Sequence, residues 1–377
     1  MHEFDKKNAY FDRLSNNPEL RWLGQNTNHL PLPPQVREAM LAAIDSDAIR
    51  GYAPPLGMEA LRAGILEDLG LHDLSVMVTD GAIEGLYHAC RTLIRPGDEF
   101  ITTDPGWKWP ISFAAASGAK IIELPIYDPA QQFKLTAPQL QSAITERTRL
   151  VYLVDPNNPL GACYNAEEIE AFASICRDAD AYLIHDCTYR HFAYDHHFAA
   201  RHYPERTLTT YSFSKWLGLA GLRVGAIVAH ADVIELLASA PPNNLGSNVL
   251  SQHAALAGLA VKASWFPHVL ATQRDNQALI HQAVAGVEGL HMPVYPSNGN
   301  FVIIDVTDSG VAPDALVDAY QRNNIMIRQG GYHTDRFASR FVKVSTTAPT
   351  QWMQEFCDLL PQMMVEARGI NDVGAQF

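Results

Sequence analysis

The sequence predicts an α/β protein with a large domain built around a mostly parallel sheet and a smaller α/β domain. Short β-rich runs alternate with helical stretches, and the helical stretches repeat their apolar residues at helical spacing. A chain of 377 residues, 47% hydrophobic and 18% charged, is long enough for two globular domains. We expect the large domain to span residues 46–264, and residues 1–45 and 265–377 to form the small domain.

Seven runs are the predicted strands of the large domain, because each combines apolar or β-branched residues with flanking turn residues. They are Ser75–Val78, Glu99–Thr103, Lys120–Leu124, Leu150–Val154, Ala181–His185, Leu208–Ser212 and Val224–Ala229. Helices are predicted between them, including Ala82–Ile94 and Ala166–Arg177. The small domain is predicted to contain strands at Phe301–Val306, Ile325–Arg328 and Phe341–Ser345.

The composition argues against several partners. A net charge of −13 disfavours nucleic acid or an anionic membrane as the main partner. We find no N-terminal segment typical of a secretion signal and no apolar run near the roughly 18–20 residues of a membrane span. We therefore expect a cytoplasmic protein. The five scattered cysteines predict neither disulfides nor a zinc site, and no known metal motif accompanies the neighbouring histidines, which we interpret as structural or solvated: His185, His191, His196 and His197.

The chemistry of such a fold is expected at the carboxyl ends of its parallel strands. After the first predicted strand, the small-residue turn Thr79–Glu84 opens a helix whose free N–H groups and dipole would bind a phosphate, at Gly81 and Ala82. The alternative is an ordinary strand-to-helix turn with Asp80 as the N-cap.

Two further turns carry candidate cofactor contacts. Trp107 follows Pro105 and would stack on a planar heteroaromatic ring, although loop tryptophans are more often core or interface residues. Asn158 lies in the turn Asp155-Pro-Asn-Asn-Pro-Leu-Gly161 and would donate its amide to a cofactor oxygen. The alternative is that both asparagines only form Asx turns.

Asp186 ends an apolar predicted strand, where a buried carboxylate is costly unless it is paired. A protonated pyridine nitrogen would be such a partner, and the carboxylate would keep the ring protonated so that it accepts electrons. Tyr189, three residues later, would hydrogen-bond the phenolic oxygen of the same ring.

Lys215 supplies the amine that a pyridoxal phosphate site requires, because a lysine forms a Schiff base with the cofactor aldehyde. Ser212 and Arg223 in the same run are suited to hold the phosphate. The Ser-x-x-Lys spacing alone is weak, since it also serves serine acyl-transfer enzymes and occurs by chance at helix starts.

Together these motifs resemble the pyridoxal phosphate-dependent aminotransferases of class I/II, which have the fold type I architecture. The resemblance covers most of the chain and follows the order Gly81-Ala82, Trp107, Asn158-Pro-Leu-Gly161, Asp186-x-x-Tyr189, Ser212-x-Ser-Lys215 and Arg223. The chain is similar to the histidinol-phosphate aminotransferase branch in the run Ser214–Gly225, in Asn26-Thr-Asn28 and in Ser297-x-x-Asn300-Phe301. That branch also contains decarboxylases.

The resemblance implies a role for each motif. Lys215 would be the Schiff-base lysine and proton shuttle, Asp186 the partner of the pyridine nitrogen, and Trp107 the stacking ring. The ring oxygen would be held by Asn158 and Tyr189, and the phosphate by Gly81, Ala82, Ser212, Ser214 and Arg223. Tyr52 matches the tyrosine that reaches the phosphate from the neighbouring subunit, which implies a homodimer with a shared site; alternatively, Tyr52 packs on the surface beside a Pro-Pro turn.

One position departs from the family. Lys343 stands where the family has a carboxylate-binding arginine, two residues before Ser345 on a late strand. A lysine supplies the charge but not the planar fork that binds a carboxylate bidentately. The substrate carboxylate would then be held more loosely, with help from Asn28, Arg328 or Arg336, or the substrate presents another group. The alternative is an edge-strand lysine that faces solvent.

We expect an aminotransferase that moves an amino group from an amino acid to a 2-oxo acid. The rival keeps pyridoxal phosphate but breaks another bond, as in a decarboxylase, a lyase or an oxidase. A regulatory module would need an N-terminal DNA-binding domain, for which the residues before Tyr52 leave no room. A dehydrogenase is disfavoured because no Gly-x-Gly-x-x-Gly follows a strand.

Overall fold

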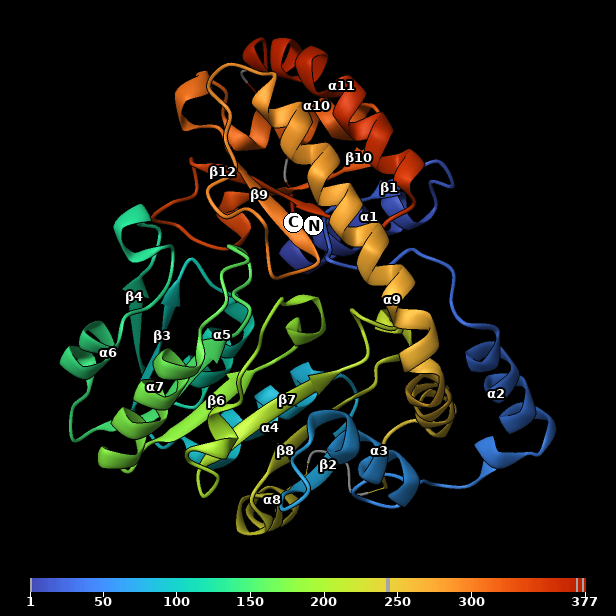
Figure 1. Cartoon of the computed structure of the whole chain (residues 1–377), viewed down its shortest axis with the longest axis vertical. Coiled ribbons are helices and arrows are strands. Elements are labelled where there is room, and N and C mark those ends of the chain that lie inside the picture. Colours follow the sequence, from blue (N-terminus) through green and yellow to red (C-terminus); the bar gives the residue numbers. More distant parts are fainter. Residues whose placement is uncertain (1, 242–244, 371, 375) are drawn as a thin grey trace. The chain divides into compact units, whose positions relative to one another are not determined.

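The computed structural model describes residues 2–241, 245–370, 372–374 and 376–377, and it divides into two compact units (Figure 1). The larger unit comprises Leu30–Ala271 and Ser297–Gly299, and the smaller one comprises Met1–His29, Thr272–Pro296 and Asn300–Phe377. The first boundary lies earlier than the predicted residue 46. The reason is that Leu30, and Val36 of helix α2 (Pro34–Asp45), are buried in the apolar cluster of the larger unit.

The larger unit is built on a seven-stranded sheet in the order β2-β8-β7-β6-β5-β3-β4. Strand β8 runs antiparallel to β2 and β7, and the other neighbouring pairs are parallel. All seven predicted strands are present, with bounds β2 Ser75–Thr79, β3 Glu99–Asp104, β4 Lys120–Pro125, β5 Thr148–Val154, β6 Tyr182–Asp186, β7 Thr207–Ser212 and β8 Gly225–Ala229.

The helices of this unit pack on the sheet and on each other. Helix α4 contacts β7 and β8, and its buried Leu86, Cys90 and Leu93 recur on one face, as the sequence predicted. Helix α7 begins with a capping box, in which Asn165 and Glu168 bond each other's backbone N–H groups. The helices are α3 Glu59–Leu69, α4 Ala82–Leu93, α5 Lys108–Ala116, α6 Ala137–Ala143, α7 Ala166–Asp178 and α8 Ala231–Ala238.

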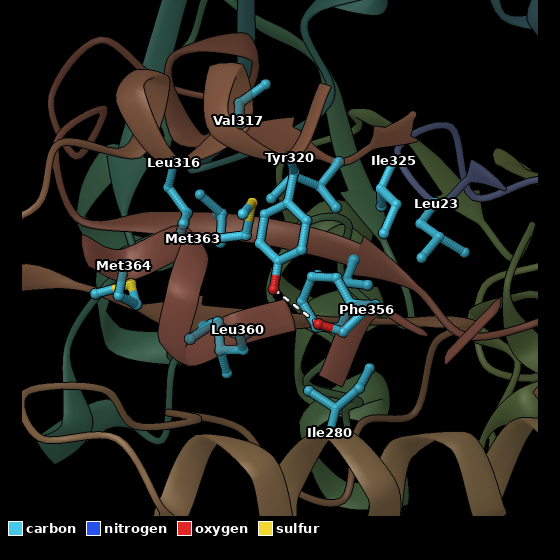
Figure 2. Close-up of a cluster of buried hydrophobic side chains, with 14 of the residues drawn as sticks. Leu23, Ile280, Leu316, Val317, Tyr320, Ile325, Phe356, Leu360, Met363 and Met364 are labelled. Carbon is cyan, nitrogen blue, oxygen red and sulfur yellow. Dashed lines mark hydrogen bonds between the residues drawn. The ribbon is translucent and has the colours of Figure 1, made fainter. Parts of the chain in front are cut away.

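The smaller unit has an apolar core between helices α10 (Pro313–Arg322) and α11 (Thr350–Arg368) and its strands. Figure 2 shows Tyr320 in this core, where its hydroxyl donates to the carbonyl of Phe356 at 2.9 Å. An antiparallel sheet in the order β11-β12-β9 provides the other wall. The remaining elements are α1 Glu3–Ser15, β1 Arg21–Trp22, β9 Phe301–Asp305, β10 Ile325–Met326, β11 Arg328–Gln329 and β12 Phe341–Ser345.

The prediction of one strand over Ile325–Arg328 is wrong. The segment forms two short strands, because β10 pairs in parallel with β1 whereas β11 pairs with β12. Each of these strands has only two residues, and Ile327 between them is where the chain changes its pairing partner.

Helix α9 (Val249–Ala285) contains the boundary between the two units. Among the described residues, this helix alone is long enough and apolar enough to cross a membrane, by length and mean hydropathy. The sequence analysis did not predict such an apolar helix. Its Ala254, Ala255 and Val269 pack in the apolar cluster of the larger unit, and Ile280 and Val284 pack in that of the smaller unit. These contacts bury part of the helix, and 28% of its apolar window is buried.

A partly buried carboxylate anchors the turn that follows β6. Asp68 of α3 accepts hydrogen bonds from four side chains: Arg190, His191, Tyr211 and Lys262. Burial alone would raise the pKa of Asp68, but the His191 hydrogen bond and the charges of Arg190 and Lys262 hold it well below its usual range. The cluster fixes Arg190 and His191, and therefore the backbone next to Tyr189.

Candidate active site

The ends of three neighbouring strands bring the predicted phosphate-binding residues together. Ser212, the last residue of β7, pairs with Gly225 of β8, and Gly225 pairs with Thr79, the last residue of β2. A Cβ on Gly225 would lie 2.5 Å from the backbone nitrogen of Ala82, so this close approach requires glycine. The turn at Ala82 and the hydroxyl of Ser212 therefore lie at the same edge of the sheet.

The amino end of α4 is built as an anion cradle. Its N-cap is Gly81, at φ +80°, and no side chain caps the helix. The alternative of Asp80 as N-cap is therefore wrong. A Cβ on Gly81 would lie 2.2 Å from Nη2 of Arg223, so the guanidinium lies directly over the turn. Free helix N–H groups and a guanidinium at one spot attract a phosphate.

Lys215 follows β7 and is half-buried, and the nitrogen of Ser214 in the same turn donates to Oγ of Ser212 at 3.3 Å. Burial and the charge of Arg223 lower the pKa of Lys215 from 10.5 to about 8, against an opposing effect of Asp186. The amine thus interacts with the guanidinium of the anion cradle and with the carboxylate at the end of β6. A lysine with a lowered pKa is a better nucleophile near neutral pH.

Asp186 is buried, and donors from three elements surround its carboxylate. Oδ1 accepts from the hydroxyls of Thr188 and Thr210, each at 2.7 Å, and from the nitrogen of Thr188 at 3.2 Å. Oδ2 accepts from the hydroxyl of Tyr152 at 2.7 Å. Sequence reasoning missed these three residues.

The signal that could have found them lies in the strand register. Asp186 pairs with Val154 of β5, and alternation places Tyr152 on the same face. On the other side His185 pairs with Thr209, so Thr210 is level with Asp186. Identifying these contacts of Asp186 requires the register between neighbouring strands, which the sequence alone does not give.

The other predicted ring contacts lie at the ends of neighbouring strands. Oδ1 of Asn157 accepts from the nitrogen of Leu160, three residues later, at 3.1 Å, and Asn158 is buried beside it. Tyr189 is buried three residues after the end of β6. Trp107 is half-buried as the N-cap of α5, after β3.

The histidines next to the site form hydrogen bonds. His185 donates from Nε2 to Oδ2 of Asp155 at 3.2 Å and accepts at Nδ1 from the nitrogen of Ala199 at 3.3 Å. The Nε2 of His196 lies 3.2 Å from the carbonyl of Asp155. Ligand atoms of His185, Cys187 and His196 lie within 4.8 Å of one another. A metal would nevertheless have to displace a hydrogen bond at either nitrogen of His185, so we interpret the cluster as structural.

In the smaller unit, Lys343 is 3% exposed on β12, the central strand of its sheet. The alternative of a solvent-facing edge lysine is therefore wrong. Val342 and Val344 face the apolar core, so Lys343 faces the opposite side, where its Nζ lies 5.4 Å from the ring centre of Phe301. Arg340, by contrast, is exposed.

Three other substrate candidates belong to the same unit. Asn28 is buried, and the segment that carries it is fixed by a bond from the nitrogen of Asn26 to Oγ of Ser345 at 2.8 Å. Arg328 is buried and pairs through its backbone with Lys343, whereas Arg336 is exposed.

Tyr52 is 81% exposed in the larger unit. It is not part of an apolar cluster of its own chain, as far as the described residues show. This exposure is what a residue that contacts a second subunit requires.

A family model described as aminotransferase class I and II matches residues 18–360. The chain belongs to this family. An aspartate aminotransferase from Pyrococcus horikoshii is 26% identical over 89% of this chain and 88% of its own length. Histidinol-phosphate aminotransferase 2 from Ralstonia nicotianae is 31% identical over 82% and 80%. The resemblance that the motifs predicted is thereby confirmed, including the presence of the histidinol-phosphate branch among the relatives.

Solved structures agree with the predicted fold type I. The N-succinyldiaminopimelate aminotransferase from Mycobacterium tuberculosis has a TM-score of 0.84 at 24% identity, covering 94% of this chain and 96% of that chain. A single mutant of the Thermus thermophilus aspartate aminotransferase has a TM-score of 0.83 at 25% identity, covering 94% and 95%. The enzyme is therefore a fold type I aminotransferase of the pyridoxal phosphate-dependent class.

The ionisation of Lys215 gives a direct test of this site. In competitive acetylation of the apoprotein followed by mass spectrometry, we expect Lys215 to label half-maximally near pH 8, because burial and Arg223 disfavour its ammonium form. Arg223→Gln should move this midpoint upward. A midpoint near the ordinary 10.5, unchanged in Arg223→Gln, would show that Lys215 is neither buried nor close to the guanidinium.

Proposed function

We propose that the enzyme transfers an amino group from an amino acid to a 2-oxo acid, with pyridoxal 5'-phosphate as its cofactor. The observation that carries this proposal is that the larger unit places the Lys215 amine, an anion cradle and the buried Asp186 carboxylate at neighbouring strand ends, where Arg223 and Asp186 both affect the amine electrostatically. The relatives named above, all aminotransferases, support it.

The residues of the larger unit fit this cofactor. Position 81 favours glycine because its φ is +80°, and a side chain there would also displace the Arg223 guanidinium from the turn. The phosphate would be held by Gly81, Ala82, Ser212, Ser214 and Arg223. The cofactor ring would be held by Asp186 at its nitrogen, by Asn158 and Tyr189 at its oxygen, and by Trp107 on its face.

When bound, the cofactor supplies an electron sink for the carbanion that forms at the substrate α-carbon. Lys215 performs the proton chemistry around it. Its lowered pKa makes the neutral amine accessible near neutral pH, so it can accept the α-proton and return it at the cofactor carbon. The Asp186 carboxylate would stabilise a positive charge on the ring nitrogen.

The substrate carboxylate is assigned to Lys343, with Asn28 as a second contact. Support comes from the family position that Lys343 occupies and from its burial, since a buried ammonium requires an anionic or aromatic partner. A lysine binds a carboxylate at a single point, so neighbouring groups must orient the substrate.

We further propose a cytoplasmic homodimer in which Tyr52 contacts the phosphate held by the other subunit. Its exposure supports this arrangement. The net charge of −13 supports small molecules, rather than nucleic acid or an anionic membrane, as the ligands.

A mixed dimer tests the active site and its sharing together. Lys215→Ala and Tyr52→Ala should each be nearly inactive alone. Equal co-expression should restore about a quarter of wild-type activity, because about half of the dimers are mixed and each mixed dimer has one intact site out of two. Lys120→Ala is the control, since this exposed lysine pairs with Glu99 away from the strand ends that carry the site. Activity retained by Lys215→Ala would contradict the assignment, and absence of restoration would exclude a shared site.

Lys343→Ala should raise the KM for the amino acid substrate about 10-fold or more, because a charge-assisted hydrogen bond to the carboxylate is lost. Lys343→Arg should retain binding, and the exposed Arg340→Ala is the matched control. Steady-state kinetics with amino acids and with the corresponding amines measures the effect. An equal change for acids and amines would place Lys343 away from the carboxylate.

A further inference from the structure

The hydroxyl of Tyr152 is a contact of Asp186 that the roles above do not explain. Tyr152 lies in the middle of β5 and is completely buried, and its ring stacks on Phe100 at a centroid distance of 6.1 Å and an interplanar angle of 27°. A buried tyrosine hydroxyl needs a partner, and here the partner is a carboxylate that is itself buried. Burial and the charge of Asp186 raise the pKa of Tyr152 well above its usual range, so the phenol remains a donor.

The donors are distributed unequally over the two carboxylate oxygens. Oδ1 receives the hydroxyls of Thr188 and Thr210 and a backbone N–H, and Thr210 is itself held because it accepts from the nitrogen of Cys187 at 3.0 Å. Oδ2 receives Tyr152 alone among the described residues. A carboxylate oxygen accepts about two hydrogen bonds, so one acceptor position remains on Oδ2.

We propose that Tyr152 is a positioning residue for the cofactor: its hydroxyl fixes the plane of the Asp186 carboxylate, with the free position of Oδ2 left for the protonated ring nitrogen. Thr210 assists from the other oxygen. The proposal rests on the proposed function, because it concerns how Asp186 serves a pyridine cofactor. Without the Tyr152 hydroxyl, the carboxylate is held in place only through Oδ1.

The test uses pyridoxamine 5'-phosphate, which binds without a covalent bond to Lys215, and the analogue in which a C–H group replaces the ring nitrogen. Calorimetry at pH 7 measures the affinity of each ligand for the apoprotein. Tyr152→Phe keeps the ring that packs on Phe100 and removes only the hydroxyl. We expect this variant to bind pyridoxamine 5'-phosphate about 10-fold less tightly than wild type and the analogue equally tightly, because only the ring nitrogen needs the carboxylate that Tyr152 orients. Thr210→Val should show the same difference between the two ligands from Oδ1.

Tyr164→Phe is the matched control, because this buried hydroxyl accepts from the nitrogen of Leu135 at 3.3 Å instead of contacting Asp186. Its relative affinity for the two ligands should equal that of wild type. Should Tyr152→Phe fail to fold, Thr210→Val carries the test alone. Equal binding of pyridoxamine 5'-phosphate by these variants and wild type, or an equal loss for both ligands, overturns the role of Tyr152. Failure of wild type itself to bind pyridoxamine or pyridoxal phosphate would instead overturn the proposed function.

Discussion

The buried carboxylate of Asp186 is the constraint on which the geometry of the larger unit's site depends. An ionised carboxylate in a protein interior costs several kcal/mol unless donors and a cation compensate it. Tyr152 of β5, Thr210 of β7 and the turn at Thr188 supply the donors, so three adjacent segments must keep their register. A positively charged pyridine ring would complete the compensation, which gives the cofactor a stabilising role as well as a chemical one.

The reversal of β8 explains why the phosphate-binding residues lie so close to this carboxylate. Because β8 runs antiparallel between β2 and β7, the ends of β2 and β7 meet its first residue, Gly225, at one edge of the sheet. The helix α4 begins there, and Arg223 lies just before Gly225. One short stretch of chain thus joins the cradle to the turn of Lys215, and the same guanidinium lowers the pKa of that amine.

Local signals explain which features were predictable from sequence. The seven strands were recognisable because turn residues flank apolar runs, and Asp186 stood out as a carboxylate that ends such a run. Tyr152 was not recognisable, because its partner depends on the register of β5 against β6. The division of Ile325–Arg328 was missed because β10 pairs with β1, at the other end of the chain. For Lys343, the strand was predictable from sequence, but its burial depends on two neighbouring strands.

The most direct measurement of the central claim is the absorption spectrum of the purified holoenzyme during addition of amino acids one at a time, without a 2-oxo acid. We expect one donor to convert the visible band of the lysine-bound cofactor stoichiometrically into that of the aminated cofactor, with release of one equivalent of 2-oxo acid. Continued turnover with release of carbon dioxide, ammonia or peroxide, and no lasting amination, would contradict transamination. Absence of the visible band after addition of pyridoxal phosphate would contradict the cofactor assignment itself.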